Sequence, residues 1–218
     1  VNPVSLAILQ PPGLWGSDNK GVDIVCGEGQ PLGVPMASGG PYFGFLSTKK
    51  SHVRQMPGRL VGRTLDTDGK IGYSLTLQAR EQHIRRGKAT SNICTNQGLL
   101  VTAATIHMSL MGSEGLAQVA SLCHHNTCVL TEKLCALEGI TLRFNTPFFH
   151  EAVLELAYPV STVLQRLEQK GIAGGYALEK LYPDLSNCLL VCATEMRSLT
   201  EIEQYVKAMD EIIRGVKQ

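Results

Sequence analysis

The densest group of polar side chains in the sequence lies between residues 80 and 92. This stretch holds four Arg or Lys residues, one His and, at its end, Thr90, Ser91 and Asn92 in succession, and an apolar segment with helical spacing follows it. Hydroxyl groups, an amide and backbone N–H groups before a helix can bind an anion, and nearby cations strengthen such binding. The pattern is compatible with an anion site and equally with a solvent-exposed charged turn.

Two glycine-rich segments, residues 27–33 and 38–41, follow an apolar segment that ends at Cys26. Glycine lets the backbone approach a ligand or another chain closely. Neither segment matches the phosphate-binding loop of nucleotide-binding proteins or the dinucleotide-binding fingerprint. Tight structural loops are therefore the favoured interpretation.

A metal site is the obvious hypothesis for the group formed by Cys123, His124, His125 and Cys128. Adjacent side chains on a helix point about 100° apart, so the two histidines do not converge on one ion. A structural role is the prediction for this group. Cys188 and Cys192 share one face of an apolar strand and are predicted to be buried thiols.

The composition narrows the class of protein. Hydrophobic residues make up 44% of the 218 residues and charged residues 18%, which is typical of a globular chain and not of a disordered one. The net charge of +1 argues against a broad nucleic-acid-binding surface. No apolar run approaches the roughly 18 residues that span a bilayer. The seven cysteines are odd in number and irregularly spaced, which indicates reduced thiols and a cytoplasmic compartment.

Hydrophobic periodicity predicts short strands first, then helices, and then alternating strands and helices. The first strands are expected at residues 4–9, 22–26, 43–46 and 71–77. Two helices follow at 97–111 and 116–137. The last part is predicted to contain strands at 140–144, 151–156 and 187–193, a helix from 160 to Gly171, and a final helix at 202–216 that begins with a capping box at Ser198 and Glu201.

The pattern predicts two units. Residues 1–112 are expected to form the end of an α/β sheet domain, and residues 113–218 a linking helix with a small α+β domain. The chain starts at Val1 with an apolar segment, so we expect a fragment that begins inside a larger fold. An exposed strand edge at residues 4–9 would then promote self-association.

Four longer motifs resemble one known family, glycine decarboxylase, which is the P-protein of the glycine cleavage system, and in particular subunit 1 of its two-subunit bacterial form. The motifs are Gly-Glu-Gly-Gln-Pro-Leu-Gly at 27–33, Gly-Gly-Pro-Tyr-Phe-Gly-Phe at 39–45, Arg-Gln-Met-Pro-Gly-Arg-Leu-Val-Gly at 54–62 and the stretch from Arg80 through Gln97. The resemblance runs through essentially the whole sequence. On the family's pattern, the chain corresponds to the C-terminal half of that subunit.

The resemblance implies the fold of fold-type-I pyridoxal-phosphate (PLP) enzymes, which is similar to that of aspartate aminotransferase. The chain would hold the end of the large domain and the small C-terminal α+β domain. The family decarboxylates glycine on PLP, releases CO2 and passes the aminomethyl group to the lipoyl arm of the H-protein. Its two kinds of subunit pair, and two pairs form a heterotetramer. Nucleic acids and membranes are not expected partners.

One departure from the family's catalytic pattern stands out. In the lysine-bearing subunit, a strand that begins Asp-Val-Val is followed by a segment ending in His-Lys, whose lysine holds the cofactor. Here Asp23-Ile24-Val25 leads to Gln30-Pro31 at the corresponding place. Proline has no amine with which to form a Schiff base. The resemblance therefore implies a non-catalytic partner without catalytic residues of its own, with PLP bound covalently to subunit 2.

A subunit of this kind can still complete its partner's site. In related PLP enzymes a segment of one chain reaches the cofactor phosphate of its neighbour. The resemblance places Thr90 in that role, with Ser91 and Asn92 beside it. It assigns a second group of residues to shaping the interface or attracting anions: Arg80, His83, Arg85 and Lys88.

Two alternatives remain open from the sequence. The chain could be a purely structural assembly subunit with no group near any cofactor. It could also be a self-sufficient PLP enzyme that uses Lys49 or Lys50, the nearest lysines downstream of the glycine-rich loop.

Overall fold

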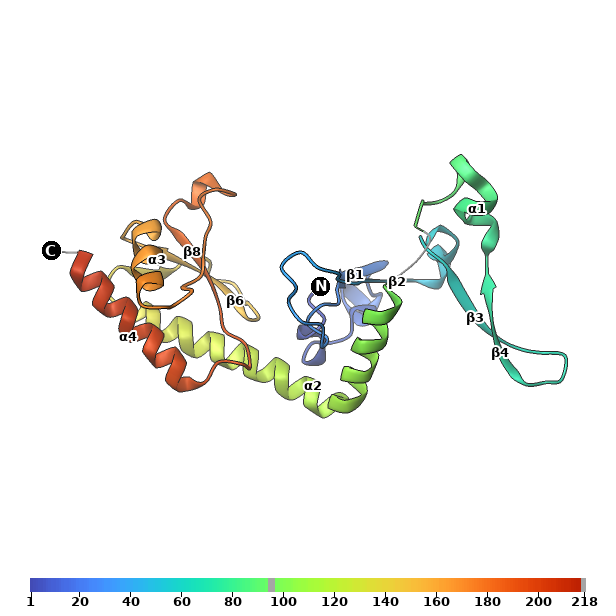
Figure 1. The fold of residues 1–218 in the computed structure, drawn as a ribbon, viewed down its shortest axis with the longest axis horizontal. Coiled ribbons are helices and arrows are strands. Elements are labelled where there is room, and N and C mark those ends of the chain that lie inside the picture. Colours follow the sequence, from blue (N-terminus) through green and yellow to red (C-terminus); the bar gives the residue numbers. More distant parts are fainter. Residues whose placement is uncertain (94–96, 217–218) are drawn as a thin grey trace. The chain divides into compact units, whose positions relative to one another are not determined.

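The computed structural model describes residues 1–93 and 97–216. The chain divides into two compact units, Val1–Ser113 and Glu114–Gln218 (Figure 1). The end of the fourth motif, residues 94–96, lies outside the described part of the chain.

The first unit contains two antiparallel strand pairs. The strand β1 (Ile24–Glu28) pairs with β2 (Gly44–Thr48), and β3 (Leu60–Leu65) pairs with β4 (Ile71–Thr76). The predicted strands at 22–26, 43–46 and 71–77 are thereby confirmed within a few residues. The described residues of this unit include the short α-helix α1 (Gln82–Arg85), and the long α2 (Gly98–Cys135) begins in this unit.

The predicted strand at residues 4–9 is wrong, because Ser5–Ala7 form a 3₁₀ turn instead. The side-chain oxygen of Asn2 accepts hydrogen bonds from the backbone N–H groups of Val4 and Ser5, and the Ser5 hydroxyl donates to the Asn2 carbonyl. A short polar side chain that bonds to nearby backbone favours a turn over an extended strand. The expected strand edge is therefore absent from these residues, and the self-association expected at it stays a prediction.

Strand β3 was missed because glycine and proline are frequent before residue 62 and favour loops. The strand forms because it pairs along its whole length with β4. A tight turn joins the two strands: one oxygen of the Asp66 carboxylate accepts hydrogen bonds from the backbone N–H groups of Asp68 and Lys70, and Gly69 has a φ of 77°. This turn fixes the register of the hairpin.

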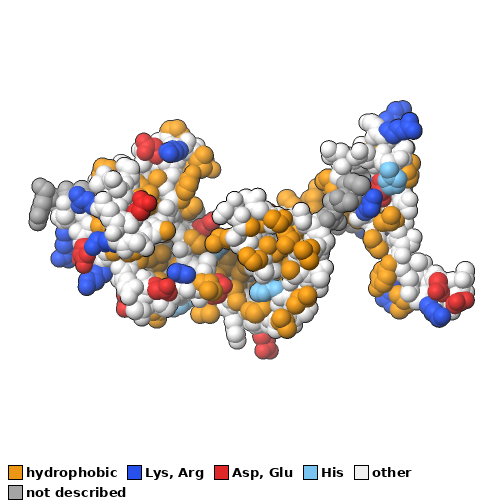
Figure 2. Space-filling model, in the orientation of Figure 1, with side chains coloured by type: hydrophobic (Ala, Val, Ile, Leu, Met, Phe, Trp, Pro, Cys, Tyr) orange, Lys and Arg blue, Asp and Glu red, His pale blue; other side chains and the backbone are white. Residues whose placement is uncertain are grey.

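The first unit buries few of its apolar side chains. Its buried hydrophobic residues, among those the structure describes, are Val34 and Ala104, whereas Val61, Ile71 and Tyr73 are more than half exposed. Figure 2 shows hydrophobic side chains gathered on the surface of this unit. The strands of this unit are thus held by backbone pairing more than by a core.

The second unit is a four-stranded antiparallel sheet packed against helices (Figure 1). The strand order is β5-β6-β8-β7, and sheet and helices share one hydrophobic core. The elements are β5 (Ile140–Leu142), β6 (Glu151–Leu156), α3 (Val160–Gln169), β7 (Tyr176–Ala177), β8 (Cys188–Cys192) and α4 (Leu199–Val216).

These elements confirm most of the predictions for the C-terminal part, and β6 has the predicted bounds. The backbone of α2 is interrupted at Gly112, where φ is 64°, close to the gap predicted between two helices. The pair Tyr176–Ala177 was not predicted, because two residues are too few to show a strand pattern.

The prediction that both cysteines of β8 are buried is right for Cys188 and wrong for Cys192. Both lie on the same face of the strand, as their spacing indicated. Cys192 is the last residue of the strand and borders a cavity, so its side chain is exposed.

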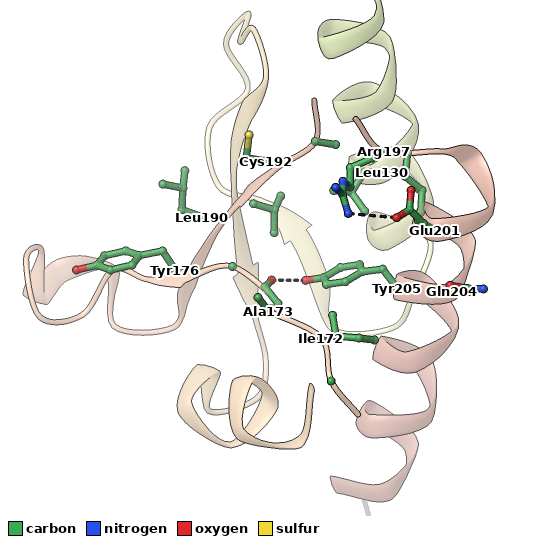
Figure 3. A pocket seen from close by; sticks show the side chains of 16 residues that line it. Leu130, Ile172, Ala173, Tyr176, Leu190, Cys192, Arg197, Glu201, Gln204 and Tyr205 are labelled. Carbon is green, nitrogen blue, oxygen red and sulfur yellow. Dashed lines mark hydrogen bonds and ion pairs between the residues drawn. The ribbon is translucent and has the colours of Figure 1, made fainter. Parts of the chain in front are cut away.

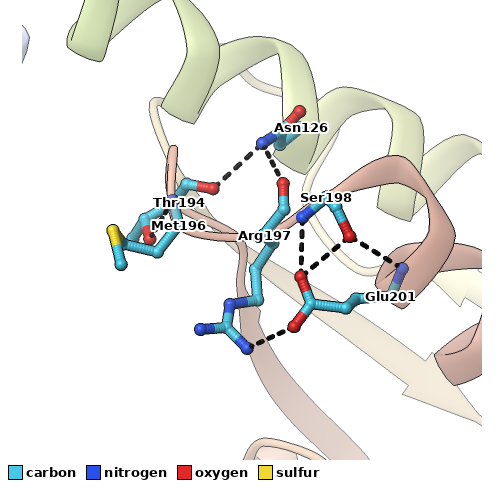
Figure 4. Close-up of polar contacts among 6 residues, drawn as sticks. All are labelled: Asn126, Thr194, Met196, Arg197, Ser198 and Glu201. Atoms are coloured by element: carbon cyan, nitrogen blue, oxygen red, sulfur yellow. Dashed lines mark hydrogen bonds and ion pairs between the residues drawn. The ribbon is translucent and has the colours of Figure 1, made fainter.

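A polar cluster joins the end of β8 to the start of α4 (Figure 4). The Asn126 amide, on α2, donates hydrogen bonds of 2.9 Å to the carbonyl oxygens of Thr194 and Arg197. The Ser198 hydroxyl accepts from the Glu201 N–H at 3.2 Å, and the Glu201 carboxylate accepts from the Ser198 N–H at 2.8 Å. The predicted capping box is confirmed, and its hydrogen bonds hold the pKa of Glu201 below its usual value.

We expect Ser198→Ala to lower the free energy of unfolding by about 1 kcal/mol, because the N-cap hydroxyl that satisfies a helix N–H is lost. The contribution of the Glu201 carboxylate is present above its unfolded-state pKa and disappears as the pH falls through the lower folded-state pKa. Urea unfolding of the wild-type protein and of the Ser198→Ala variant, at neutral and at acidic pH, measures both effects. The exposed Ser186→Ala serves as control, and an equal loss in it would contradict the assignment of the cap.

Candidate functional site

The polar stretch 80–92 folds into tight turns at the end of the β3–β4 hairpin opposite its connecting turn, which we call the foot of the hairpin. Its elements are 3₁₀ turns at Gln78–Arg80 and Arg86–Lys88 on either side of α1. The Arg80 side chain donates a hydrogen bond through Nη1 to the carbonyl oxygen of Met56, before β3, and the Thr90 N–H donates to the Arg80 carbonyl oxygen at 3.1 Å. These bonds hold the two ends of the stretch, Arg80 and Thr90, next to each other and hold Arg80 next to Met56.

A cavity of about 250 Å³ lies in this region, and we call it the basic pocket. Its lining residues are Arg54, Leu77, Ala79, Arg80, Arg85, Lys88 and Thr90. Four of them carry a positive charge and none carries a negative charge, so their summed field favours an anion. The volume is smaller than the roughly 300 Å³ at which whole-ligand pockets begin, and so suits an anionic group of a larger molecule.

The acidic residue within the stretch does not neutralise the pocket. Glu81 is 7% exposed, and its Oε2 lies 3.5 Å from Nδ1 of His83 and 3.9 Å from Nε of Arg59. Neither His83 nor Arg59 lines the pocket. The buried Nε and Nη2 of Arg80 and Oε1 of Glu81 have no hydrogen-bond partner among the described residues. Buried polar atoms are costly when unpaired, so these three atoms reduce the stability of the stretch in which they lie.

The structure separates the three small polar residues that the sequence places in succession. Thr90 lines the basic pocket, whereas Ser91 and Asn92 line a neighbouring hollow of about 550 Å³ together with Gln82 and Arg86. The Ser91 hydroxyl also accepts a hydrogen bond from the Ile93 N–H at 3.1 Å.

The basic pocket thus brings together Thr90, Arg80, Arg85 and Lys88. His83 does not line it and contacts Glu81 instead. Arg54 joins them from the 3₁₀ helix Lys50–Gln55, although in the sequence only its place at the start of the third motif distinguishes it.

The loop that stands where a cofactor-binding lysine is expected carries no amine. The side-chain amide of Gln30 donates to the Val34 carbonyl oxygen, and the Gln30 N–H donates to the Glu28 carboxylate at 3.2 Å. A Cβ atom on Gly33 would come within 2.5 Å of the His107 ring, so glycine is needed where this loop meets α2. The loop is closed by its own hydrogen bonds, and Pro31 lies exposed on it.

Lys49 is engaged in an ion pair. Its ammonium group lies 3.0 Å from Oδ1 of Asp23 and donates to the Gly21 carbonyl oxygen at 3.2 Å. The hydrogen bond and charge of Lys49 lower the pKa of the Asp23 carboxyl. The Lys49 side chain would have to leave Asp23 before it could form a Schiff base with a carbonyl. The Gln30-Pro31 loop offers no amine for covalent attachment of PLP and Lys49 is engaged with Asp23, whereas the four cations of the basic pocket suit a phosphate group.

The larger cavity of the second unit, about 680 Å³, is lined by the segment 171–176, β8 and the first half of α4 (Figure 3). The Tyr205 hydroxyl donates to the Gly174 carbonyl oxygen, and burial raises the pKa of this phenol. Arg197 pairs with Glu201 at 3.2 Å, so the two charges at its edge neutralise each other. The cavity is mainly apolar and presents no unpaired charge for catalysis.

The members of the Cys123–Cys128 group do not share one partner: Sγ of Cys128 lies 3.7 Å from Nε2 of His124, whereas Cys123 contacts Glu195. The Cys123 thiol donates to the Glu195 carboxylate at 3.1 Å, and burial raises its pKa to about 12, which leaves it protonated and unreactive. His124 contacts the carbonyl oxygen of Phe149 at 3.0 Å. Within residues 1–93 and 97–216, no three His, Cys, Asp or Glu side chains are placed to hold a metal ion, and no helix is long and apolar enough to cross a membrane.

Comparison with protein families and with curated relatives gives a consistent result. The family model described as "Glycine cleavage system P-protein" matches residues 1–209. A protein of Legionella pneumophila (strain Philadelphia 1) named "Probable glycine dehydrogenase (decarboxylating) subunit 1" is 68% identical over 98% of this chain and 46% of its own length. The protein of the same name from Nitrosomonas europaea is 59% identical over 98% of the chain and 47% of its own length. The chain spans about half the length of the curated relatives it matches.

Solved structures agree with this result. The crystal structure of glycine decarboxylase (P-protein) of the glycine cleavage system in an inhibitor-bound form matches 97% of this chain and 47% of its own chain, with a TM-score of 0.87 and 40% identity. A glutamate decarboxylase of Lactobacillus brevis shares the fold at a TM-score of 0.56 and 13% identity. The predicted fold class, the α/β fold of fold-type-I PLP enzymes, is confirmed. The chain belongs to the family of glycine cleavage system P-proteins.

Proposed function

We propose that this chain is part of the non-catalytic subunit 1 of a two-subunit glycine dehydrogenase (decarboxylating). It completes the PLP site of a lysine-bearing subunit and has no cofactor lysine of its own. The observation that carries the proposal is the basic pocket, in which Thr90 lies among four cations, in a chain whose glycine-rich loop offers no amine. The names of the relatives as subunit 1 support a second subunit.

In this proposal the residues of the chain bind and orient the cofactor's phosphate. The Thr90 hydroxyl donates a hydrogen bond to it, and the guanidinium groups of Arg80 and Arg85 and the Lys88 ammonium balance its charge. Ser91 and Asn92 line the neighbouring hollow and bind next to the phosphate group. PLP, once bound by the partner, supplies the electron sink for glycine decarboxylation.

The remaining parts of the proposal concern the assembled enzyme. The aminomethyl group passes to the lipoyl arm of the H-protein, two subunit pairs form a heterotetramer, and the enzyme acts in the cytoplasm. Support comes from the family model, which describes a glycine cleavage system protein, and from the unpaired pattern of cysteines.

A purely structural role remains the second candidate function, because the exposed apolar side chains of the first unit favour contact with other protein surfaces. It differs from the main proposal in one outcome: substitution of Thr90 would leave the assembled enzyme fully active. For a self-sufficient enzyme, the ion pair with Asp23 disfavours Lys49, and the labelling experiment below tests Lys50.

Borohydride reduction in the presence of PLP tests the main proposal. We expect full-length subunit 1 to acquire no covalent label, its partner to be labelled, and glycine decarboxylation to require both. Mass spectrometry of the separated subunits gives the readout, and the variant Lys49→Arg, which retains the charge, is the matched control. A label on Lys49 or Lys50 would show that the chain binds its own cofactor.

A further inference from the structure

The β3–β4 hairpin has two chemically different faces. Directly paired residues of antiparallel strands lie on the same face, and residues one position apart lie on opposite faces. The pairs Val61 with Leu75, Arg63 with Tyr73 and Leu65 with Ile71 therefore form one face, which we call the hairpin face. The opposite face is made of small and mostly polar residues apart from one leucine: Leu60, Gly62, Thr64, Gly72, Ser74 and Thr76.

The hairpin face is exposed. Val61 and Leu65 are each 63% exposed, Ile71 56% and Tyr73 74%, and hydrophobic side chains are visible along the hairpin in Figure 2. Alternation of large apolar with small or polar residues is the pattern of a sheet with one covered face. A single two-stranded hairpin is only marginally stable in water. The sequence of the hairpin is thus that of a strand pair whose hairpin face is covered by another protein surface.

The hairpin is joined to the basic pocket at its foot. Arg80 of the pocket bonds to the Met56 carbonyl shortly before β3, and Glu81 lies 3.9 Å from Arg59, the residue that precedes β3. Strand β4 ends at Thr76, and Leu77 already lines the pocket. A protein that brings an anion into the basic pocket therefore lies beside the hairpin, an argument that rests on the proposed function.

The chemistry of the face also specifies its partner. Arg63 lies in the middle of five apolar side chains, is exposed, and has no carboxylate within ion-pair distance among the described residues. When an arginine is covered by another surface, an acidic partner is needed to offset the loss of its hydration. A surface complementary to the hairpin face is apolar and carries a carboxylate opposite Arg63.

We propose that the hairpin face is the docking surface for the lysine-bearing second subunit, which covers it with an apolar patch and an acidic side chain opposite Arg63. The same contact brings the cofactor phosphate of that subunit to the basic pocket. Tyr73 and Arg63, at the centre of this face, are of the residue types that are enriched among those dominating binding energy at protein interfaces.

Neighbouring substitutions with the same added charge test this proposal. Tyr73→Asp places a carboxylate on the hairpin face, and Ser74→Asp places one on the opposite face. With the full-length subunit and its partner, we expect Tyr73→Asp to raise the dissociation constant at least about tenfold and Ser74→Asp to change it less than about twofold. Arg63→Glu should weaken binding, and Arg63→Lys should retain most of it. Sedimentation velocity over a concentration series gives the constants.

Each other outcome is decisive. A Tyr73→Asp subunit that assembles normally, or an equal effect of Ser74→Asp, overturns the docking surface and leaves the proposed function standing. A lower thermal midpoint of the isolated full-length Tyr73→Asp subunit, beyond that of Ser74→Asp, shows that the subunit covers this face with its own residues and likewise overturns the proposal. Failure of the wild-type subunits to assemble overturns the proposed function as well.

Discussion

Replacement of Thr90 by valine is expected to weaken PLP binding by the assembled enzyme roughly 10- to 150-fold. Valine keeps the shape of threonine but removes the hydroxyl. A hydrogen bond to a charged group contributes about 1.5–3 kcal/mol, and each 1.4 kcal/mol is a factor of ten in affinity. Titration of the cofactor-free complex with PLP, followed by visible absorbance, measures the change. Assembly of the two subunits should be unaffected.

Thr102→Val is the matched control for this experiment. The Thr102 hydroxyl donates to the Gly98 carbonyl oxygen at 2.9 Å within α2 and does not line the basic pocket. Its loss should leave PLP affinity within about twofold, since it removes a single neutral hydrogen bond inside a helix. Unchanged PLP affinity and turnover in Thr90→Val would favour the purely structural role of the subunit.

Truncation of the core of the second unit is expected to cause the largest loss of stability. Leu154 is fully buried in β6 and pairs across the sheet with the equally buried Leu189. Leu154→Ala removes apolar contacts and leaves a cavity, which costs about 2–5 kcal/mol at such positions. Thermal unfolding followed by circular dichroism should show a clearly lower midpoint for the second unit.

The control for this prediction is Leu181→Ala, which makes the same chemical change at a side chain that is 63% exposed. It should lower the free energy of unfolding by less than about 0.5 kcal/mol, as is usual for surface substitutions. Similar losses in the two variants would mean that Leu154 does not lie in the folding core.

The second unit is the part of the fold that local sequence patterns predicted well. The strand Glu151–Leu156 shows the period of two, and the last helix is preceded by its capping box at Ser198 and Glu201. Both features arise from interactions between residues that are close in the sequence. The unit also has a core of its own, so its periodically spaced hydrophobic residues are the ones that are buried.

The first unit was predicted less well, because its strands are decided by pairing between segments. Strand β3 contains Gly62 and follows a proline-containing segment, and only its ladder with β4 makes it a strand. At residues 4–9 an apolar run suggested a strand, but the hydrogen bonds of Asn2 produce a turn. With few buried side chains, the unit has little core with which to enforce an apolar pattern.

The sequence by itself determined that Gln30-Pro31, and no lysine, stands where the family resemblance places the cofactor lysine. It also placed most of the cations of the site near Thr90. Only the tertiary structure decided which side chains share a pocket: it brought in Arg54 from a distant 3₁₀ helix and moved Ser91 and Asn92 to a neighbouring hollow. The physical reason is that neighbouring residues of a tight turn point in different directions, while the hydrogen bonds at the hairpin's foot hold segments distant in sequence together.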